Sequence, residues 1–147
     1  MNEKLDDVRK AAWRNLLTAR ARIAETIDRD LAAAGVINFE WYDVLLWLEE
    51  ADGGRLKMGE LADRVLISRS GLTRMVDRLE AAGYLRREHC LDDRRAVYAV
   101  LTDSGRAARA AAWAVYEPLI VRYFGRHLSD TDARTMRDAL ARCLTPV

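Results

Sequence analysis

A run of arginine and hydroxyl side chains in the middle of the chain has the residue types that contact nucleic acid. Seven arginines lie between positions 69 and 95, and serine or threonine occupies positions 68, 70 and 73. Guanidinium groups form paired hydrogen bonds with phosphates and with guanine edges, and hydroxyls reach either kind of group. Five acidic residues interrupt the run: Asp77, Glu80, Glu88, Asp92 and Asp93. The stretch therefore predicts a nucleic-acid surface only if folding turns its arginines and hydroxyls to one face.

Cys90 is the second candidate for chemistry, because it lies beside His89 and close to Arg87. An exposed thiol among basic groups is prone to oxidation, so Cys90 is a candidate redox site. A thiol enzyme is the alternative, but neighbouring residues of a strand point to opposite faces, which disfavours a Cys90–His89 dyad. The two cysteines lack the spacing of a metal site, and no paired carboxylates or glycine-rich phosphate loop is present. We therefore predict no enzyme activity, no metal site and no cofactor.

The arginines and hydroxyls need an element that positions them, and residues 69–82 have the pattern of a helix. Ser68 is a suitable N-cap and Gly83 a suitable C-terminal stop. At about 100° per residue, the apolar side chains share one arc, which holds Leu72, Met75, Val76 and Leu79. The opposite, polar arc holds Arg69, Ser70, Thr73, Arg74, Asp77 and Arg78. A short helix at 59–65 precedes it, which predicts a helix-turn-helix unit, although a solvated helix face would have the same polar arc.

The residues after this helix favour contact with DNA. Segments 84–88 and 96–101 are rich in strand formers, and a polar turn at 89–95 separates them. A helix-turn-helix followed by a β-hairpin is a winged helix, whose tip reaches phosphates or the minor groove. Arg94 and Arg95 lie at the predicted tip, and Asp93 is close enough in sequence to pair with Arg95 and support it.

Long helices are predicted on both sides of this unit. Residues 5–34 carry apolar residues at helical spacing, and another helix begins after Asn38 and stops at 52–54. A helix at 104–124 is expected to kink or break near 116–117 because of Pro118. Ser129 begins a last helix with a capping-box pattern. The apolar stripes at the two chain ends fit helices that join two subunits, and they fit a monomeric bundle equally.

Length and composition fit one globular domain. The chain has 147 residues, of which 50% are hydrophobic and 32% charged, enough for a core without disulfides or metals. No apolar run approaches the roughly 20 residues of a transmembrane helix, and the polar N-terminus lacks a secretory signal. We therefore expect a cytoplasmic protein with free thiols and no membrane partner.

The middle third of the chain resembles the MarR family of transcription regulators. The similarity to the family's helix-turn-helix lies in residues 61–62, 67–74 and 76–83. Residues 93–97, 101–102 and 105–106 are similar to its wing and to the start of the next helix. The flanking helices agree in order and length. Leu66 departs from the pattern, because many members carry a small residue in this turn.

The resemblance implies a mainly α fold, a winged helix-turn-helix with a small β-hairpin wing and N- and C-terminal dimerisation helices. It implies a single domain over 1–147, with dimerisation helices at 1–36 and 103–147 and a DNA-binding lobe at 37–102. The implied function is a homodimeric repressor that binds double-stranded DNA at a pseudo-palindromic operator. With the polar arc, it predicts DNA contacts by Ser68, Arg69, Ser70, Thr73, Arg74, Arg78, Arg94 and Arg95. A winged helix that binds protein is the alternative, and weak salt dependence would indicate it.

Two ways of releasing DNA follow from the resemblance. Family members often bind aromatic acids in a crevice, which here would use Trp13, Arg20, Trp41, Asp43, Trp47 and Trp113. Tryptophans at helical spacing are more often core residues, so a small aromatic effector is an open expectation. Some relatives instead sense oxidants through a cysteine, usually near the N-terminus, where this chain has none. Oxidation of Cys90 in the wing is the remaining redox hypothesis.

Overall fold

The computed structural model describes residues 3–65, 68–93 and 95–145. The chain divides into two compact units. One unit is Leu31–Tyr116, and the other combines Met1–Asp30 with Glu117–Val147. None of the helices in the described residues is long and apolar enough to cross a membrane.

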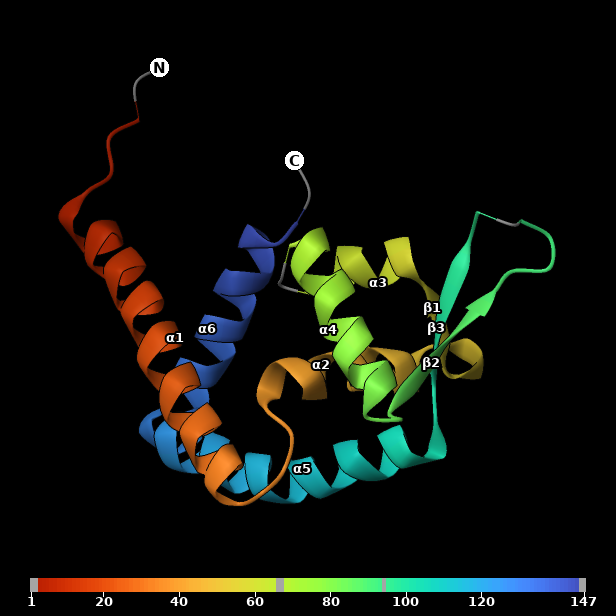
Figure 1. The fold of residues 1–147 in the computed structure, drawn as a ribbon. Helices are drawn as coiled ribbons and strands as arrows, with labels where there is room; N and C mark the ends of the chain where they lie inside the picture. Colours follow the sequence, from red (N-terminus) through yellow and green to blue (C-terminus); the bar gives the residue numbers. More distant parts are fainter. Residues whose placement is uncertain (1–2, 66–67, 94, 146–147) are drawn as a thin grey trace. The chain divides into compact units, whose positions relative to one another are not determined.

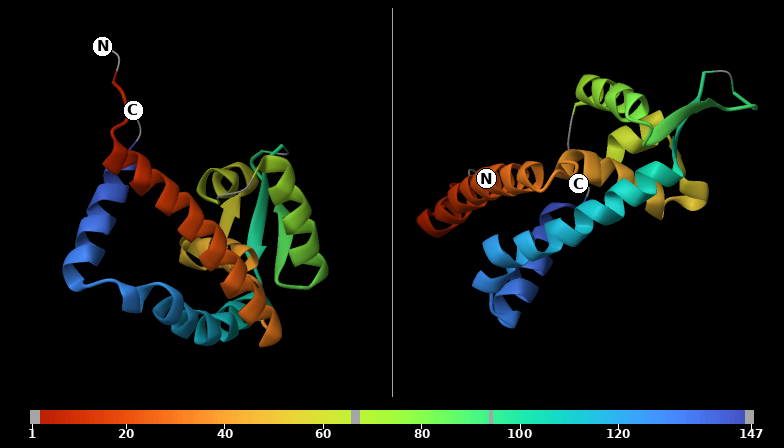
Figure 2. Two further views of the ribbon diagram at one scale, coloured as in Figure 1. Left: turned by 90° about the vertical axis from the view of Figure 1, so that its left-hand side faces the viewer. Right: turned by 60° about the horizontal axis from the view of Figure 1, so that its bottom comes forward.

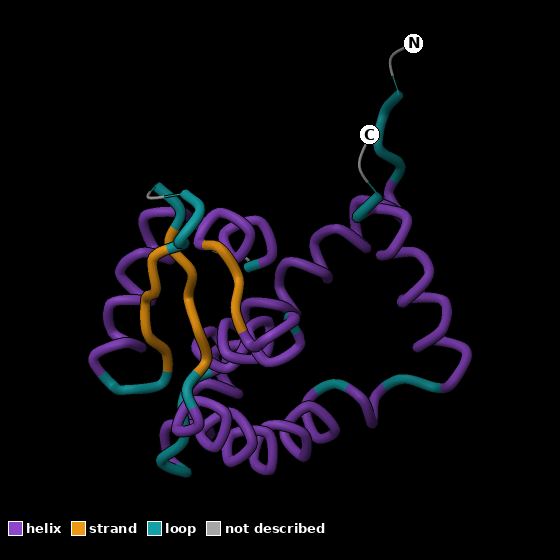
Figure 3. Tube along the Cα trace, turned by 90° about the vertical axis from the view of Figure 1, so that its right-hand side faces the viewer, coloured by secondary structure: helices purple, strands orange, loops and turns teal. Residues whose placement is uncertain are grey.

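The unit Leu31–Tyr116 is a winged helix-turn-helix, as predicted (Figure 1). Its elements are α2 (Phe39–Glu50), the 3-10 turn η1 (Asp52–Gly54), β1 (Arg55–Lys57), α3 (Met58–Arg64), α4 (Arg69–Ala81), β2 (Leu85–His89), β3 (Val97–Leu101) and the first part of α5 (Asp103–Tyr123). The three strands lie side by side in the order β1-β3-β2, with both pairings antiparallel (Figure 3). The β2–β3 hairpin is the wing, and its register runs from Leu85 opposite Leu101 to His89 opposite Val97.

One hydrophobic core holds the helix-turn-helix to the sheet. The apolar arc of α4 is buried as predicted, with Leu72, Met75, Val76 and Leu79 all inside. Leu45 and Leu48 of α2 and Leu61 of α3 pack in the same cluster. Burial of apolar surface stabilises the fold by roughly 25 cal/mol per Å². The apolar arc of α4 therefore packs into the core, and the opposite arc remains in solvent.

Three predicted helix starts are confirmed by their side-chain caps. The Asn38 side chain accepts the Trp41 backbone N–H at 2.9 Å, and Ser68 Oγ accepts the Gly71 N–H at 3.1 Å. Ser129 Oγ accepts the Asp132 N–H at 3.1 Å, and Asp132 accepts the Ser129 N–H in return. These hydrogen bonds lower the pKa of Asp132, because they favour its charged form.

Two elements differ from the sequence expectation. Of the predicted kink or break near 116–117, the break is wrong, because α5 continues as one helix through Pro118. A proline in a helix removes one backbone hydrogen bond, and the remaining bonds can maintain the helix around it. Strand β1 was not expected, since its three residues are too few to show an alternating pattern; it pairs with β3 through Leu56 opposite Ala99.

The second unit consists of α1 (Asp7–Ala33) up to Asp30, the end of α5, the 3-10 turn η2 (Gly125–His127) and α6 (Asp130–Cys143) (Figure 2). Tyr123 Oη donates a hydrogen bond to Asp30 Oδ2 at 2.6 Å and so joins α5 to α1. Ile27 is the only buried side chain in the described part of this unit. Large apolar side chains are exposed instead: Leu5, Val8, Trp13, Leu17, Val121 and Leu144.

Candidate nucleic-acid interface

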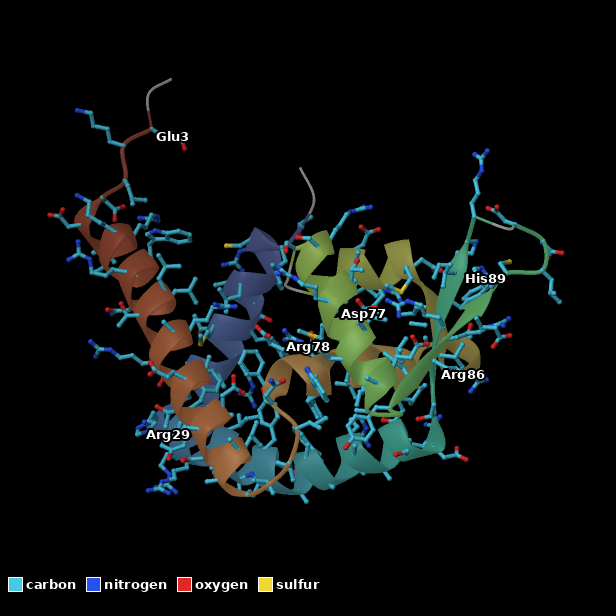
Figure 4. All side chains as sticks on the ribbon, viewed as in Figure 1. Glu3, Arg29, Asp77, Arg78, Arg86 and His89 are labelled. Carbon is cyan, nitrogen blue, oxygen red and sulfur yellow. The ribbon has the colours of Figure 1, made fainter. Side chains whose placement is uncertain are left out.

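The polar arc of α4 lies in solvent opposite the buried arc. Ser68, Arg69, Ser70, Thr73, Arg74 and Arg78 are all exposed. Figure 4 labels Asp77 and Arg78 on this helix. The structure therefore gathers the six predicted helix residues on one exposed surface, because the core holds the other side.

Hydrogen bonds within the helix hold the hydroxyl groups of this surface. Ser68 Oγ caps the helix and lies 3.4 Å from Ser70 Oγ, and Thr73 Oγ1 donates to the Arg69 carbonyl at 3.1 Å. Each hydroxyl oxygen keeps acceptor capacity for a further partner. The Arg69 guanidinium lies 3.7 Å from the Asp63 carboxylate, and both are largely exposed, so this pair is weak.

Arg74 and Arg78 have no ion-pair partner among the residues that the structure describes. A guanidinium in this state presents all its donors to solvent and is available to an incoming phosphate or base edge. The arrangement can therefore bind an extended anionic partner along one face of α4.

The wing tip is held by contacts of Asp93. Its Oδ1 accepts the Arg95 backbone N–H at 3.0 Å, and its carbonyl accepts the Ala96 N–H at 3.0 Å. The predicted contact between Asp93 and Arg95 thus runs through the backbone amide, which leaves the exposed Arg95 side chain free of this carboxylate. Arg94 lies outside the described residues, as does Leu66.

Arg87 connects the wing to α4, a role that nothing in the sequence indicated beyond a nearby acidic pair. Its guanidinium donates to Asp77 Oδ1 at 2.6 Å and to Glu80 Oε1 at 2.8 Å. Burial lowers the pKa of Arg87, but the hydrogen bonds to the two carboxylates have the larger combined effect. The pKa of Arg87 is therefore raised above its ordinary value. In the sequence alone, Asp77 and Glu80 are only two acidic residues within a basic stretch.

A cavity of about 540 Å³ lies within the unit Leu31–Tyr116. Its lining is mostly apolar and consists of Ala32, Gly35, Val36, Ile37, Asn38, Trp41, Ala82, Tyr84, Ala108 and Ala111. The Trp41 and Tyr84 rings meet edge to face with centroids 6.1 Å apart. This volume suits a small organic molecule, and no charged side chain is among the lining residues.

The other aromatic residues predicted to line a pocket have different surroundings. Trp113 stacks on Tyr42, with ring centroids 5.9 Å apart. Arg64 lies 5.7 Å from the centre of the Trp47 ring. Trp13 and Arg20 are exposed on α1 in the other unit. Within Leu31–Tyr116, the structure therefore brings only Trp41 of the predicted set to the cavity.

Asp43 lies on α2 and is half-buried. Burial raises the pKa of this carboxyl group, a hydrogen bond with Trp47 lowers it in part, and the charge of Glu50 raises it again. The net shift is upward because desolvation disfavours the charged form. The charged form of Asp43 is therefore destabilised by its partial burial in α2.

Cys90 is half-buried at the end of β2, beside exposed His89, and Cys143 is exposed on α6. Both are free thiols. Within the described part of the chain, no group of three or more histidine, cysteine or acidic side chains could hold a metal ion.

Comparisons with known proteins agree with this arrangement. The sequence pattern of the MarR family matches residues 37–96, from α2 to the end of the wing turn. The chain is 35% identical over 89 residues to the HTH-type transcriptional regulator PrsX of Escherichia coli. This match covers 60% of the chain and 53% of PrsX, so the chain spans about half the length of this relative.

Two solved structures from Streptomyces coelicolor extend the similarity to almost the whole chain. Sco3205, a MarR family transcriptional regulator solved in complex with DNA, is 28% identical with a TM-score of 0.87, over 99% of this chain and 93% of that one. AbsC, another MarR family transcriptional regulator, is 30% identical with a TM-score of 0.83. That alignment covers 95% of this chain and 93% of AbsC. With this identity over nearly the full length of both chains, and with the family pattern across its winged helix, the protein belongs to the MarR family.

Proposed function

We propose that the protein is a homodimeric, sequence-specific DNA-binding repressor that acts at a pseudo-palindromic operator. The observation that carries this proposal is the exposed arc of α4, where arginines and hydroxyls stand opposite a buried arc. A helix with such a face suits the major groove, whose base edges accept hydrogen bonds from arginine. The DNA complex of Sco3205, at 28% identity, supports the same use of the fold.

The residues divide into two roles on DNA. Arg74 and Arg78, which have no ion-pair partner among the described residues, contact base edges or phosphates from the groove. Ser68, Arg69, Ser70 and Thr73 surround the N-terminus of α4, whose free N–H groups favour an anion. Arg95, and with it Arg94, reaches the backbone or the minor groove from the wing.

The proposal of a dimer is supported by the unit that combines Met1–Asp30 with Glu117–Val147. Its described part has one buried side chain, Ile27, whereas Val8 is 78% exposed and Trp13 58% exposed. Helices with so much exposed apolar surface need a partner to cover them. A second copy of the chain supplies identical apolar helices, which is the arrangement of a two-fold symmetric dimer.

A small aromatic molecule in the cavity beside Trp41 and Tyr84 is the proposed effector. The cavity is lined by the end of α1 and the segment that follows it, by Trp41 of α2, by Ala82 and Tyr84 just after α4, and by α5. A ligand there therefore lies next to the C-cap residue of the DNA-reading helix and the residue just before the wing. Because its lining is without charge, a neutral or weakly polar aromatic compound fits it better than an acid paired with Arg20. Release by oxidation of Cys90 remains a prediction, and unchanged oxidant sensitivity of DNA binding in Cys90→Ser would refute it.

The test of the proposed function is a fluorescence-anisotropy titration against duplexes tiled across the DNA upstream of the protein's own gene. We expect one duplex, the operator, to bind far more tightly than unrelated DNA. With six or more phosphate contacts, its affinity should fall about a thousandfold between about 50 and 200 mM salt. Binding to no duplex would leave two alternatives, an operator elsewhere or a winged helix that recognises protein, and binding that ignores salt would favour the second.

A further inference from the structure

Arg87 occupies the junction between the wing and α4. Strand β2 lies at the edge of the sheet, so one side of its backbone has no neighbouring strand. The Arg87 backbone N–H on that side donates to Glu80 Oε2 at 2.8 Å, and the guanidinium donates to the other oxygen of Glu80 at 2.8 Å. A second guanidinium nitrogen donates to Asp77 at 2.6 Å. Three hydrogen bonds from one residue therefore join the edge of the wing to the last two turns of α4.

The setting makes the Arg87–Glu80 part of this connection stronger than an ordinary surface ion pair. The Arg87 side chain is 28% exposed and Glu80 is 39% exposed, whereas Asp77 is 60% exposed. Partly buried charges are less screened by salt and water, and the planar guanidinium fixes the direction of each hydrogen bond. Arg87 thus holds both carboxylates in defined positions.

The position of Asp77 gives the connection a consequence for DNA binding. Asp77 belongs to the polar arc of α4 and follows Arg74 by three residues, a spacing at which helical side chains meet and form ion pairs. A free Asp77 carboxylate would draw Arg74 away from DNA and repel phosphates. In the structure that carboxylate lies against Arg87, and Arg74 has no ion-pair partner among the described residues.

We propose that Arg87 is a positioning residue for DNA recognition: it sequesters Asp77, which keeps Arg74 free for DNA. The residue does not touch DNA itself. This inference rests on the DNA binding proposed above, and it assigns a role to a strand residue outside the predicted contact set.

The test is a double-mutant cycle on operator affinity, with wild type, Arg87→Gln, Asp77→Asn and the double variant. Arg87→Gln should weaken operator binding about tenfold and should reduce the slope of log affinity against log salt by about one, as loss of one phosphate contact does. The double variant should bind within about twofold of Asp77→Asn, because no carboxylate is then free to capture Arg74. Arg86→Gln, which removes the same charge from the adjacent exposed residue of β2, is the matched control and should cost less than about threefold.

Each outcome bears on the inference. An equal loss from Arg87→Gln with and without Asp77 would overturn it, since that is the result for a direct phosphate contact or for a purely structural residue. Thermal unfolding without DNA separates stability from binding, and Arg87→Met, which also removes the charge, replaces Arg87→Gln in the cycle if the latter does not fold. Wild-type protein that binds no DNA would remove the proposed function together with the inference. Wild-type binding without coupling would remove the role of Arg87 alone.

Discussion

At the scale of a single residue, Asp43 makes the stability of the winged helix depend on pH. Its pKa is raised by burial, so the folded state binds a proton in a range where the unfolded chain has lost it. An acid with a raised folded pKa stabilises the fold only while it is protonated. Stability from this group is therefore highest below the ordinary pKa of 3.8 and falls as the pH rises through the raised value.

Asp43→Asn should remove this dependence, because the amide has no charge to bury and can still accept a hydrogen bond from Trp47. We expect the variant to be more stable than wild type at pH 7 and to lose that advantage near pH 4, measured by urea unfolding at both values. Asp52→Asn, in the exposed turn after α2, serves as the control. A constant difference between Asp43→Asn and wild type at both pH values would contradict the role of burial.

At the scale of the elements, Gly105 determines how α5 leaves the sheet. An added Cβ at Gly105 would lie 1.9 Å from the carbonyl oxygen of Tyr84, which is backbone and cannot turn aside. The Gly105 N–H also donates to Thr102 Oγ1 at 3.0 Å, and Thr102 donates in turn to the Gly83 carbonyl at 2.6 Å. Gly105 therefore permits a close approach between the start of α5 and the start of the wing.

Gly105→Ala should destabilise the protein by about 1 to 3 kcal/mol, the range for overpacking a filled site. Gly59→Ala is the matched control, because an added Cβ there meets nothing within 4 Å. It should leave stability unchanged or raise it by about 0.5 kcal/mol. Chemical denaturation of both variants measures the difference, and equal stability of the two would refute the close-packing argument.

Helix boundaries and the wing could be predicted from the sequence because local signals determine them. Ser68 and Asn38 cap helices within three residues of themselves, and alternating strand formers flank the polar turn of the wing. Strand β1 could not be predicted, since it depends on pairing with β3, more than forty residues away in the chain. The link from Arg87 to Asp77 and Glu80 was missed for the same reason: it joins a strand to a helix through tertiary structure.

At the scale of the whole molecule, the apolar stripes at the chain ends were ambiguous in the sequence. A stripe at helical spacing marks a buried face without saying what covers it. The folded chain leaves Trp13, Leu17 and Val121 largely exposed within their unit, which a self-sufficient bundle would not do. The exposed fractions, rather than the spacing, thus support a second copy as the cover.

Trp13→Glu combined with Leu17→Glu should convert the proposed dimer to a monomer, because each charge would be buried without a partner in the interface. Light scattering coupled to size-exclusion chromatography measures the mass directly. Leu91→Glu is the control, since Leu91 is fully exposed at the wing and lies in the other unit. A double variant that keeps the mass of two chains would show that these residues are not at the subunit interface.

The measurement that tests the central claim most directly is the ratio of operator affinity to unrelated-duplex affinity for wild type and Arg74→Ala. Arg126→Ala, an exposed arginine in η2, is the control for loss of charge. If Arg74 reads a base edge from the exposed arc of α4, its loss should reduce this ratio about tenfold, equivalent to about 1.4 kcal/mol, while Arg126→Ala leaves it unchanged. An unchanged ratio for Arg74→Ala, with both affinities as in wild type, would contradict the assignment of the α4 arc as the surface that reads DNA.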